Sequence, residues 1–133
     1  MVWRLNYLAD THTLVWLFND RVRLPQRVID AIAGDENDIF VSPVSAYEIA
    51  LKFNIGKWPE VGELATAFEA QCRSAGLLSL AITLRDAQAA GLLPLSHRDP
   101  FDRLLAAQSQ SNGLPILSAD PALDLFDVER IWD

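Results

Sequence analysis

The chain has 133 residues, half of them hydrophobic, with a single cysteine and a net charge of −7. This size fits one domain over residues 1–133, and the single cysteine excludes an intramolecular disulfide or a cysteine-rich zinc site. The acidic charge argues against a long nucleic-acid footprint, and the absence of a bilayer-spanning apolar stretch or a signal-peptide pattern predicts a cytoplasmic protein without membrane contact.

Strand-like and helix-like segments alternate along the chain. The expected strands are residues 3–9, 39–41, 77–81, 115–118 and 128–132. The expected helices are residues 11–19, 26–33, 43–54, 62–75, 83–90 and 100–112, several of which a glycine ends. This alternation predicts an α/β fold, a three-layer α/β/α sandwich around a mostly parallel central sheet.

Four acidic residues fall where these segments would bring them together. Asp10 and Asp120 each end an expected strand, whereas Glu48 and Asp102 lie inside expected helices. In parallel sheets, sites form beyond the carboxyl ends of the strands. Converging carboxylates repel each other and are costly to desolvate unless a cation joins them. Because Mg²⁺ and Mn²⁺ prefer oxygen ligands, the sequence predicts an acidic metal pocket.

Each acid also has an interpretation that needs no metal. Three acids stand at the N-cap position of an expected helix, a role that aspartate favours: Asp10, Asp99 and Asp120. Asp102, in the first turn of its helix, gains from the helix dipole. Glu48 lies in an apolar stripe and needs a partner, which Lys52 at the i+4 position could provide as a salt bridge.

Other polar residues near these acids are candidates for accessory roles. Thr11 and Ser118 could orient carboxylates, although hydroxyl residues are also common at strand-to-helix turns. Arg103 could steer a phosphate backbone, with surface charge as the simpler alternative. His97 could contact a phosphate or a partner, but a lone histidine near a cap is more often structural.

Four segments, residues 8–12, 45–49, 99–108 and 116–120, read LADTH, SAYEI, DPFDRLLAAQ and ILSAD. In this order and at these intervals they resemble the PIN-domain family, and most closely the VapC-type toxins of bacterial type II toxin–antitoxin pairs. The DPFDR segment is the most specific part of the resemblance. One departure is Ala119, where many relatives carry a charged or polar residue, and it bears on substrate contacts rather than on metal binding.

The resemblance implies a Mg²⁺- or Mn²⁺-dependent endoribonuclease that hydrolyses RNA phosphodiester bonds with metal-activated water. It also implies a homodimer and a cognate VapB-like antitoxin protein whose C-terminal segment crosses the active site. The family's acidic quartet falls on Asp10, Glu48, Asp102 and Asp120. The accessory positions that the resemblance adds are Asp99, Thr11 and Ser118.

Several other functions are open to a chain of this kind. A receiver domain would need paired acids after the first strand, and a dehalogenase-like site would need Asp-x-Asp, whereas the chain reads Asp10-Thr11-His12. No glycine-rich phosphate loop is present. The alternatives that stay open are a PIN-like RNA-processing nuclease without an antitoxin and a non-catalytic interaction domain whose acids are caps and surface charge.

Overall fold

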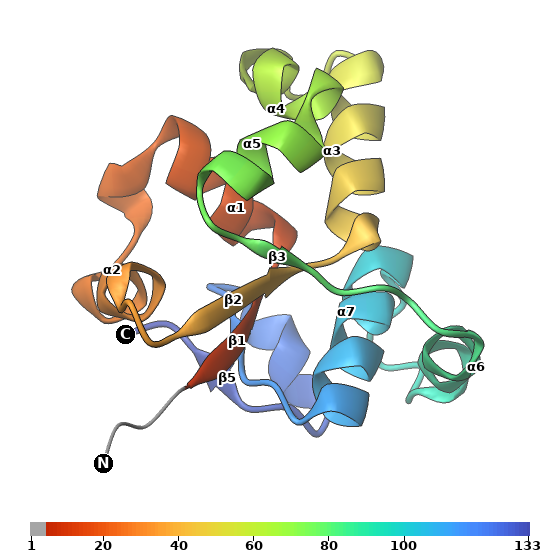
Figure 1. Ribbon diagram of the computed structural model, residues 1–133. Coiled ribbons are helices and arrows are strands. Elements are labelled where there is room, and N and C mark those ends of the chain that lie inside the picture. The colour runs from red at the N-terminus through yellow and green to blue at the C-terminus, as the bar shows by residue number, and fades with distance from the viewer. Residues whose placement is uncertain (1–4) are drawn as a thin grey trace.

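A five-stranded parallel sheet forms the centre of the computed structural model, which describes residues 5–133 (Figure 1). The sheet has the order β3-β2-β1-β4-β5, and each of its pairings is parallel. The strands are β1 (Asn6–Ala9), β2 (Asp38–Val41), β3 (Leu78–Ser79), β4 (Ile116–Leu117) and β5 (Arg130–Ile131). Helices cover both faces, so the predicted α/β/α sandwich is confirmed.

Seven α-helices and three short 3-10 helices lie within residues 5–133. The α-helices are α1 (Thr11–Asn19), α2 (Gln26–Ala33), α3 (Pro43–Asn54), α4 (Gly62–Thr66), α5 (Phe68–Ser74), α6 (Leu84–Leu92) and α7 (Pro100–Asn112). The 3-10 helices are η1 (Arg21–Arg23), η2 (Pro59–Val61) and η3 (Pro121–Leu125). None of the helices in this part of the chain is long and apolar enough to cross a bilayer.

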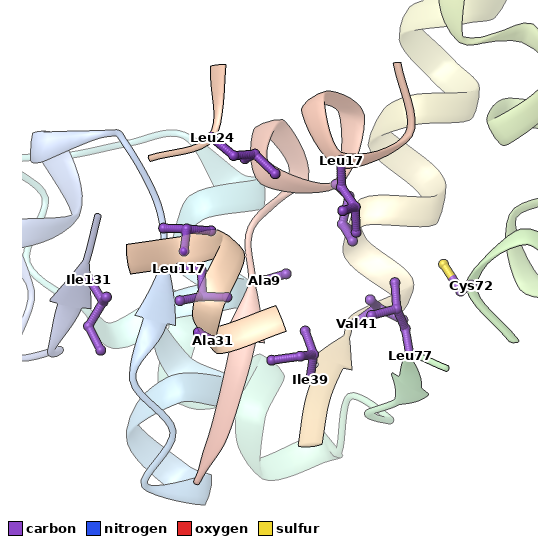
Figure 2. Packing of buried hydrophobic residues seen from close by; sticks show 12 residues of the cluster. Ala9, Leu17, Leu24, Ala31, Ile39, Val41, Cys72, Leu77, Leu117 and Ile131 are labelled. Carbon is purple, nitrogen blue, oxygen red and sulfur yellow. The ribbon is translucent and has the colours of Figure 1, made fainter. Parts of the chain in front are cut away.

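Successive residues of each inner strand face opposite cores, as the two-residue period of a strand requires. Ala9 and Leu117 join a cluster with residues of α1 and α2, which Figure 2 shows from close by. Leu8 and Ile116 point the other way and pack with α7 and Phe126. All four strand residues are at most 1% exposed. The sheet is therefore buried on both faces, which explains the nearly continuous apolar strands of the sequence.

The expected helix over residues 62–75 is interrupted, and this is a correction to the sequence prediction. Ala67 leaves the helical region with φ −137° and ψ 41°, which separates α4 from α5. The Thr66 hydroxyl donates to the Gly62 carbonyl over 2.8 Å, a side-chain bond of the kind that bends helices. The two halves serve different cores, since Leu64 packs with Val15 whereas Cys72 joins the sheet cluster.

The outer parts of several expected strands are irregular. β3, β4 and β5 each have two residues, fewer than the sequence predicts. β1 begins at Asn6, and the first two residues of the expected strand 3–9 lie outside the described part of the chain. The strands β3 and β5 form the edges of the sheet, where short strands leave few unpaired backbone groups for another chain to pair with.

The sheet order places a topological switch point between β1 and β4. The chain moves from β1 through β2 to β3 on one side, and β4 and β5 fill the other side. Crevices for ligands form at such points, beyond the carboxyl ends of the strands. Here the Asp10 amide donates to the Leu117 carbonyl over 3.1 Å, and the Thr13 hydroxyl donates to the same carbonyl over 2.8 Å. These bonds fix the first turn of α1 against the end of β4.

We expect Gly113→Ala to destabilise the protein by about 1 kcal/mol, because Gly113 ends α7 at φ +61°, in the left-handed region that other residues resist. Gly91→Ala is the matched control, since this glycine lies in α6 and an added Cβ meets nothing within 4 Å. It should stabilise by about 0.5–1 kcal/mol. Urea unfolding of both variants measures the difference, and shifts of the same sign would contradict this account.

Candidate active site

Asp10 directly follows β1, at the switch point where a parallel sheet is expected to form its ligand crevice. Its side chain is buried, with the residue 4% exposed, and its Oδ1 accepts the Thr13 amide over 2.9 Å, so it also caps α1. Burial raises the pKa of the Asp10 carboxyl, and hydrogen bonds from Ser118 and Thr13 oppose that rise. The predicted cap is thus present, but a cap at a helix end does not by itself require a buried carboxylate.

Ser118 connects Asp10 with the acid that follows β4. The Ser118 side chain is fully buried and hydrogen-bonds the Asp10 carboxylate. Its Oγ also accepts the Asp120 amide over 3.0 Å. Asp120 itself is exposed and caps η3 by accepting the Ala122 amide over 2.9 Å. Ser118 therefore contacts the Asp10 carboxylate and the backbone of Asp120, at the ends of adjacent strands.

Asp102 lies in the first turn of α7 and faces the Asp120 side of the crevice. Its Oδ2 is 2.8 Å from Nε2 of His97, and ligand atoms of His97, Asp102 and Asp120 lie within 4.8 Å of one another. Burial raises the pKa of the Asp102 carboxyl to about 6. The His97 hydrogen bond opposes this rise, whereas the negative charges of Asp99 and Asp120 add to it.

Asp99 holds the start of α7 in place. Its Oδ1 accepts the amides of Phe101 over 2.8 Å and Asp102 over 3.2 Å, which makes it the N-cap that the sequence predicts. Its charge raises the pKa of Asp102, so it lies near the cluster as well. These contacts support two roles for Asp99: it orients Asp102, and it adds negative charge beside that carboxylate.

Glu48 is buried on α3, but it is paired with a cation of the chain itself. Lys52 Nζ donates to Glu48 Oε2, which is the i+4 salt bridge that the sequence left open. Thr11 directly follows Asp10, and its hydroxyl is 3.0 Å from that of Ser45 on α3. The structure thus brings Asp102 and Asp120 together and connects Asp10 through Ser118, and it places Glu48 in an ion pair.

Arg103 does not face a phosphate, which corrects the accessory role considered for it. The residue is 8% exposed, and its two terminal nitrogens donate to four backbone carbonyls over 2.7–3.1 Å. One carbonyl, that of Gly91, lies at the end of α6, and the other three belong to the loop that carries His97; they are Leu93, Pro94 and His97. Arg103 is therefore a structural residue that fixes the position of His97 beside Asp102.

His97 is the site residue that the sequence undervalued. It precedes Asp102 by five positions and lies in a loop, where no helical or strand spacing indicates that the two side chains meet. Its ring also packs against Phe126, with centroids 5.7 Å apart. The available signal was only its closeness in sequence to Asp99, and the contact depends on the loop shape that Arg103 imposes.

The donor set of the crevice fits a hard divalent cation. Carboxylate oxygens are the ligands that Mg²⁺ and Mn²⁺ prefer, and Mn²⁺ also accepts an imidazole nitrogen. Asp10 and Asp102 are desolvated acids with raised pKa values, which means that their ionised forms lack sufficient compensation within the protein. A bound cation would supply that compensation.

Comparisons with known proteins agree with this geometry. A sequence model described as the PIN domain matches residues 7–129, and the chain therefore belongs to the PIN domain family, a family of nucleases. Searching curated protein sequences gives no significant match.

Solved structures with the same fold cover nearly the whole chain. VapBC2 from Rickettsia felis, bound to a promoter DNA fragment, is similar with a TM-score of 0.72 at 13% identity, over 97% of this chain and 100% of that one. VapBC-1 from nontypeable Haemophilus influenzae gives 0.70 at 12% identity, over 96% and 97%. FitAcB from Neisseria gonorrhoeae gives 0.63 at 15% identity, over 94% and 96%. At these identities the likeness establishes the fold.

The metal-free protein should lose stability as the pH rises from about 4 to about 7. The pKa of Asp102 is raised from 3.8 to about 6 in the folded state, so the folded protein holds this proton more tightly than the unfolded chain does. The loss should be on the order of 2 kcal/mol, because a tenfold change in acid dissociation corresponds to about 1.4 kcal/mol. Asp102→Asn should remove the share of this dependence that Asp102 contributes, leaving the share of Asp10, whose pKa is also raised. Exposed Asp35→Asn should leave the dependence unchanged, as measured by urea unfolding across the pH range.

We expect Arg103→Lys to lower the free energy of unfolding by about 2–4 kcal/mol, because an ammonium cannot satisfy four carbonyls arranged for a guanidinium. Exposed Arg98→Lys makes the same chemical change nearby and should have little effect. Thermal unfolding measures both. An Arg103→Lys variant of normal stability with weakened RNA binding would restore the phosphate-contact interpretation.

Proposed function

We propose that the chain is a single-domain, Mg²⁺- or Mn²⁺-dependent endoribonuclease that acts as the toxin of a toxin–antitoxin pair. Membership of the PIN domain family supports the nuclease class. We add the metal, the RNA substrate and the biological role to this class. They are supported by the sequence resemblance and by the chemistry of the crevice.

One observation carries the proposal. Asp102 lies in the first turn of α7 and Asp120 follows the next strand, β4, and their ligand atoms lie within 4.8 Å of each other and of His97. Asp10 connects to the same place through Ser118. Capping explains the backbone contacts of Asp10 and Asp120, but it does not explain why Asp102 points at another carboxylate, where the charges repel.

The residues divide by the work that each does. We assign cation binding to Asp10, Asp102 and Asp120, and we assign Glu48 to a second cation or to the orientation of the attacking water. Ser118 contacts the Asp10 carboxylate and the backbone of Asp120. When bound, Mg²⁺ or Mn²⁺ would neutralise charge on the scissile phosphate and lower the pKa of a water molecule. By family analogy the products carry 5′-phosphate and 3′-hydroxyl ends.

The proposed partner is a VapB-like antitoxin. The names VapBC2 and VapBC-1 of two similar structures denote the same kind of pair that the sequence resemblance indicates. A crevice lined with carboxylates attracts an Arg or Lys side chain, and the net charge of −7 favours a basic partner. We further propose a homodimer, as the resemblance to VapC-type toxins implies.

The decisive experiment is cleavage of mixed cellular RNA by the purified protein with Mg²⁺, with Mn²⁺ and with EDTA. We expect discrete cuts that require metal. Asp10→Asn should reduce the rate by about 100-fold or more, since loss of even an outer partner of a metal site costs about 10–100-fold. Its fold should persist because an amide oxygen can still accept the Thr13 amide.

Asp35→Asn serves as the control, because it changes an exposed acid remote in sequence from the crevice. Metal should also raise the thermal stability of the wild type. Equal cleavage by Asp10→Asn in Mg²⁺ would refute the assignment of Asp10. No cutting and no stabilisation by metal would favour a non-catalytic interaction domain, in which the acids are caps.

A further inference from the structure

The pair between Lys52 and Glu48 differs from an ordinary surface salt bridge. Both residues lie on α3, one turn apart, and Lys52 Nζ donates to Glu48 Oε2. The side chains are 18% and 7% exposed, so water screens this pair poorly. An exposed pair of this spacing forms and breaks readily. Within residues 5–133, the Lys52 ammonium is the one group that hydrogen-bonds the Glu48 carboxylate.

Aromatic rings hold Lys52 in that position. Its Nζ lies 4.5 Å from the centre of the Trp58 ring and 6.0 Å from that of Phe101, both within the range of cation–π attraction. The backbone reinforces the arrangement, because the amides of Lys57 and Trp58 both donate to the Lys52 carbonyl, over 2.9 and 3.1 Å. The chain after α3 thus folds back and places Trp58 over its own lysine.

The pair lies beside the acidic crevice. Phe101, which contacts Lys52, immediately precedes Asp102 in α7. On the other side, the Thr11–Ser45 hydrogen bond of 3.0 Å joins the residue after Asp10 to α3, one turn before Glu48. Lys52 is therefore a cation of the protein itself at the position of one proposed catalytic acid, whereas within residues 5–133 the side chains of the other three acids hydrogen-bond no lysine or arginine. Arg130 lies close enough to Asp120 for their charges to attract, but its guanidinium is paired with Asp124.

We propose that Lys52 is a built-in counter-ion that closes the Glu48 side of the crevice, so that the substrate-free protein binds one divalent ion, at the Asp102–Asp120 side. This inference rests on the proposed metal-dependent function. A second ion at Glu48 has to displace an ammonium that a carboxylate and two rings hold. Among the described residues, an ion at Asp102 and Asp120 displaces no such hydrogen-bonded cation, because the nearby Arg130 is paired with Asp124. Lys52 is a positioning residue in this account, since it sets where cations bind.

Mn²⁺ titration of the full chain by isothermal calorimetry tests the proposal without measuring activity. The wild type should bind one ion per chain. Lys52→Met, which keeps an unbranched apolar side chain for the Trp58 ring but removes the charge, should bind two. Lys57→Met is the matched control, because Lys57 is exposed and is the only other lysine of the chain, and this variant should bind one.

A second variant and a second signal guard against misfolding. Lys52→Gln keeps a donor for Glu48 without the charge, so it should also bind a second ion, and circular dichroism checks that each variant is folded. Electron paramagnetic resonance should show Mn²⁺–Mn²⁺ coupling in the two Lys52 variants only, because only these variants are expected to hold two ions in one molecule.

Each outcome decides between the alternatives. One ion in folded Lys52→Met and Lys52→Gln, or two ions in the wild type, overturns the role of Lys52 and leaves the proposed nuclease standing if RNA is still cut with metal. A second ion in Lys57→Met as well shows a general effect of charge and also overturns it. No Mn²⁺ bound by the wild type at millimolar concentration refutes the metal-dependent function, and this inference falls with it.

Discussion

The junction between β1 and β4 is the constraint on which the site depends. The Leu117 carbonyl accepts both the Asp10 amide and the Thr13 hydroxyl, so the end of one strand and the first turn of α1 share a single acceptor at the end of the neighbouring strand. Because Ser118 follows Leu117 directly, the same junction places its hydroxyl against the Asp10 carboxylate. Two segments more than a hundred residues apart in sequence thus meet in one register. A shift of that register by one residue would turn each of these side chains to the other face of the sheet, so that Ser118 would no longer meet Asp10.

The crevice keeps groups that the folded protein would be more stable without. Burial raises the pKa of both Asp10 and Asp102, which means that their ionised forms are disfavoured relative to those in the unfolded chain. The surroundings reduce this penalty in different ways: Asp10 receives hydrogen bonds from Ser118 and Thr13, whereas Asp102 has one from His97. Stability is then supplied elsewhere, by the two apolar clusters on either side of the sheet. A division of this kind, between stabilising layers and a strained edge, is typical of functional sites.

The sequence predicts whatever depends on neighbours along the chain. The helices over residues 11–19, 26–33 and 43–54 match their expected bounds, and the caps formed by Asp10 and Asp99 are local patterns of the same kind. The Lys52 salt bridge also follows from helical spacing. The break at Ala67 was not predictable, because it arises when the two halves of one amphipathic segment pack against different clusters. Likewise, Arg103 and His97 acquire their roles from a loop whose path depends on carbonyls as many as twelve residues away from the arginine.

The stacking around Trp58 gives the protein an optical property. Its indole contacts the Lys52 ammonium, at 4.5 Å, and the His12 ring, with centroids 5.3 Å apart. The same His12 ring contacts Trp16, which packs in turn against Trp132. An ammonium group quenches the fluorescence of an adjacent indole. The emission of Trp58 therefore depends on whether Lys52 remains in place, which makes this tryptophan an intrinsic reporter of the position of Lys52.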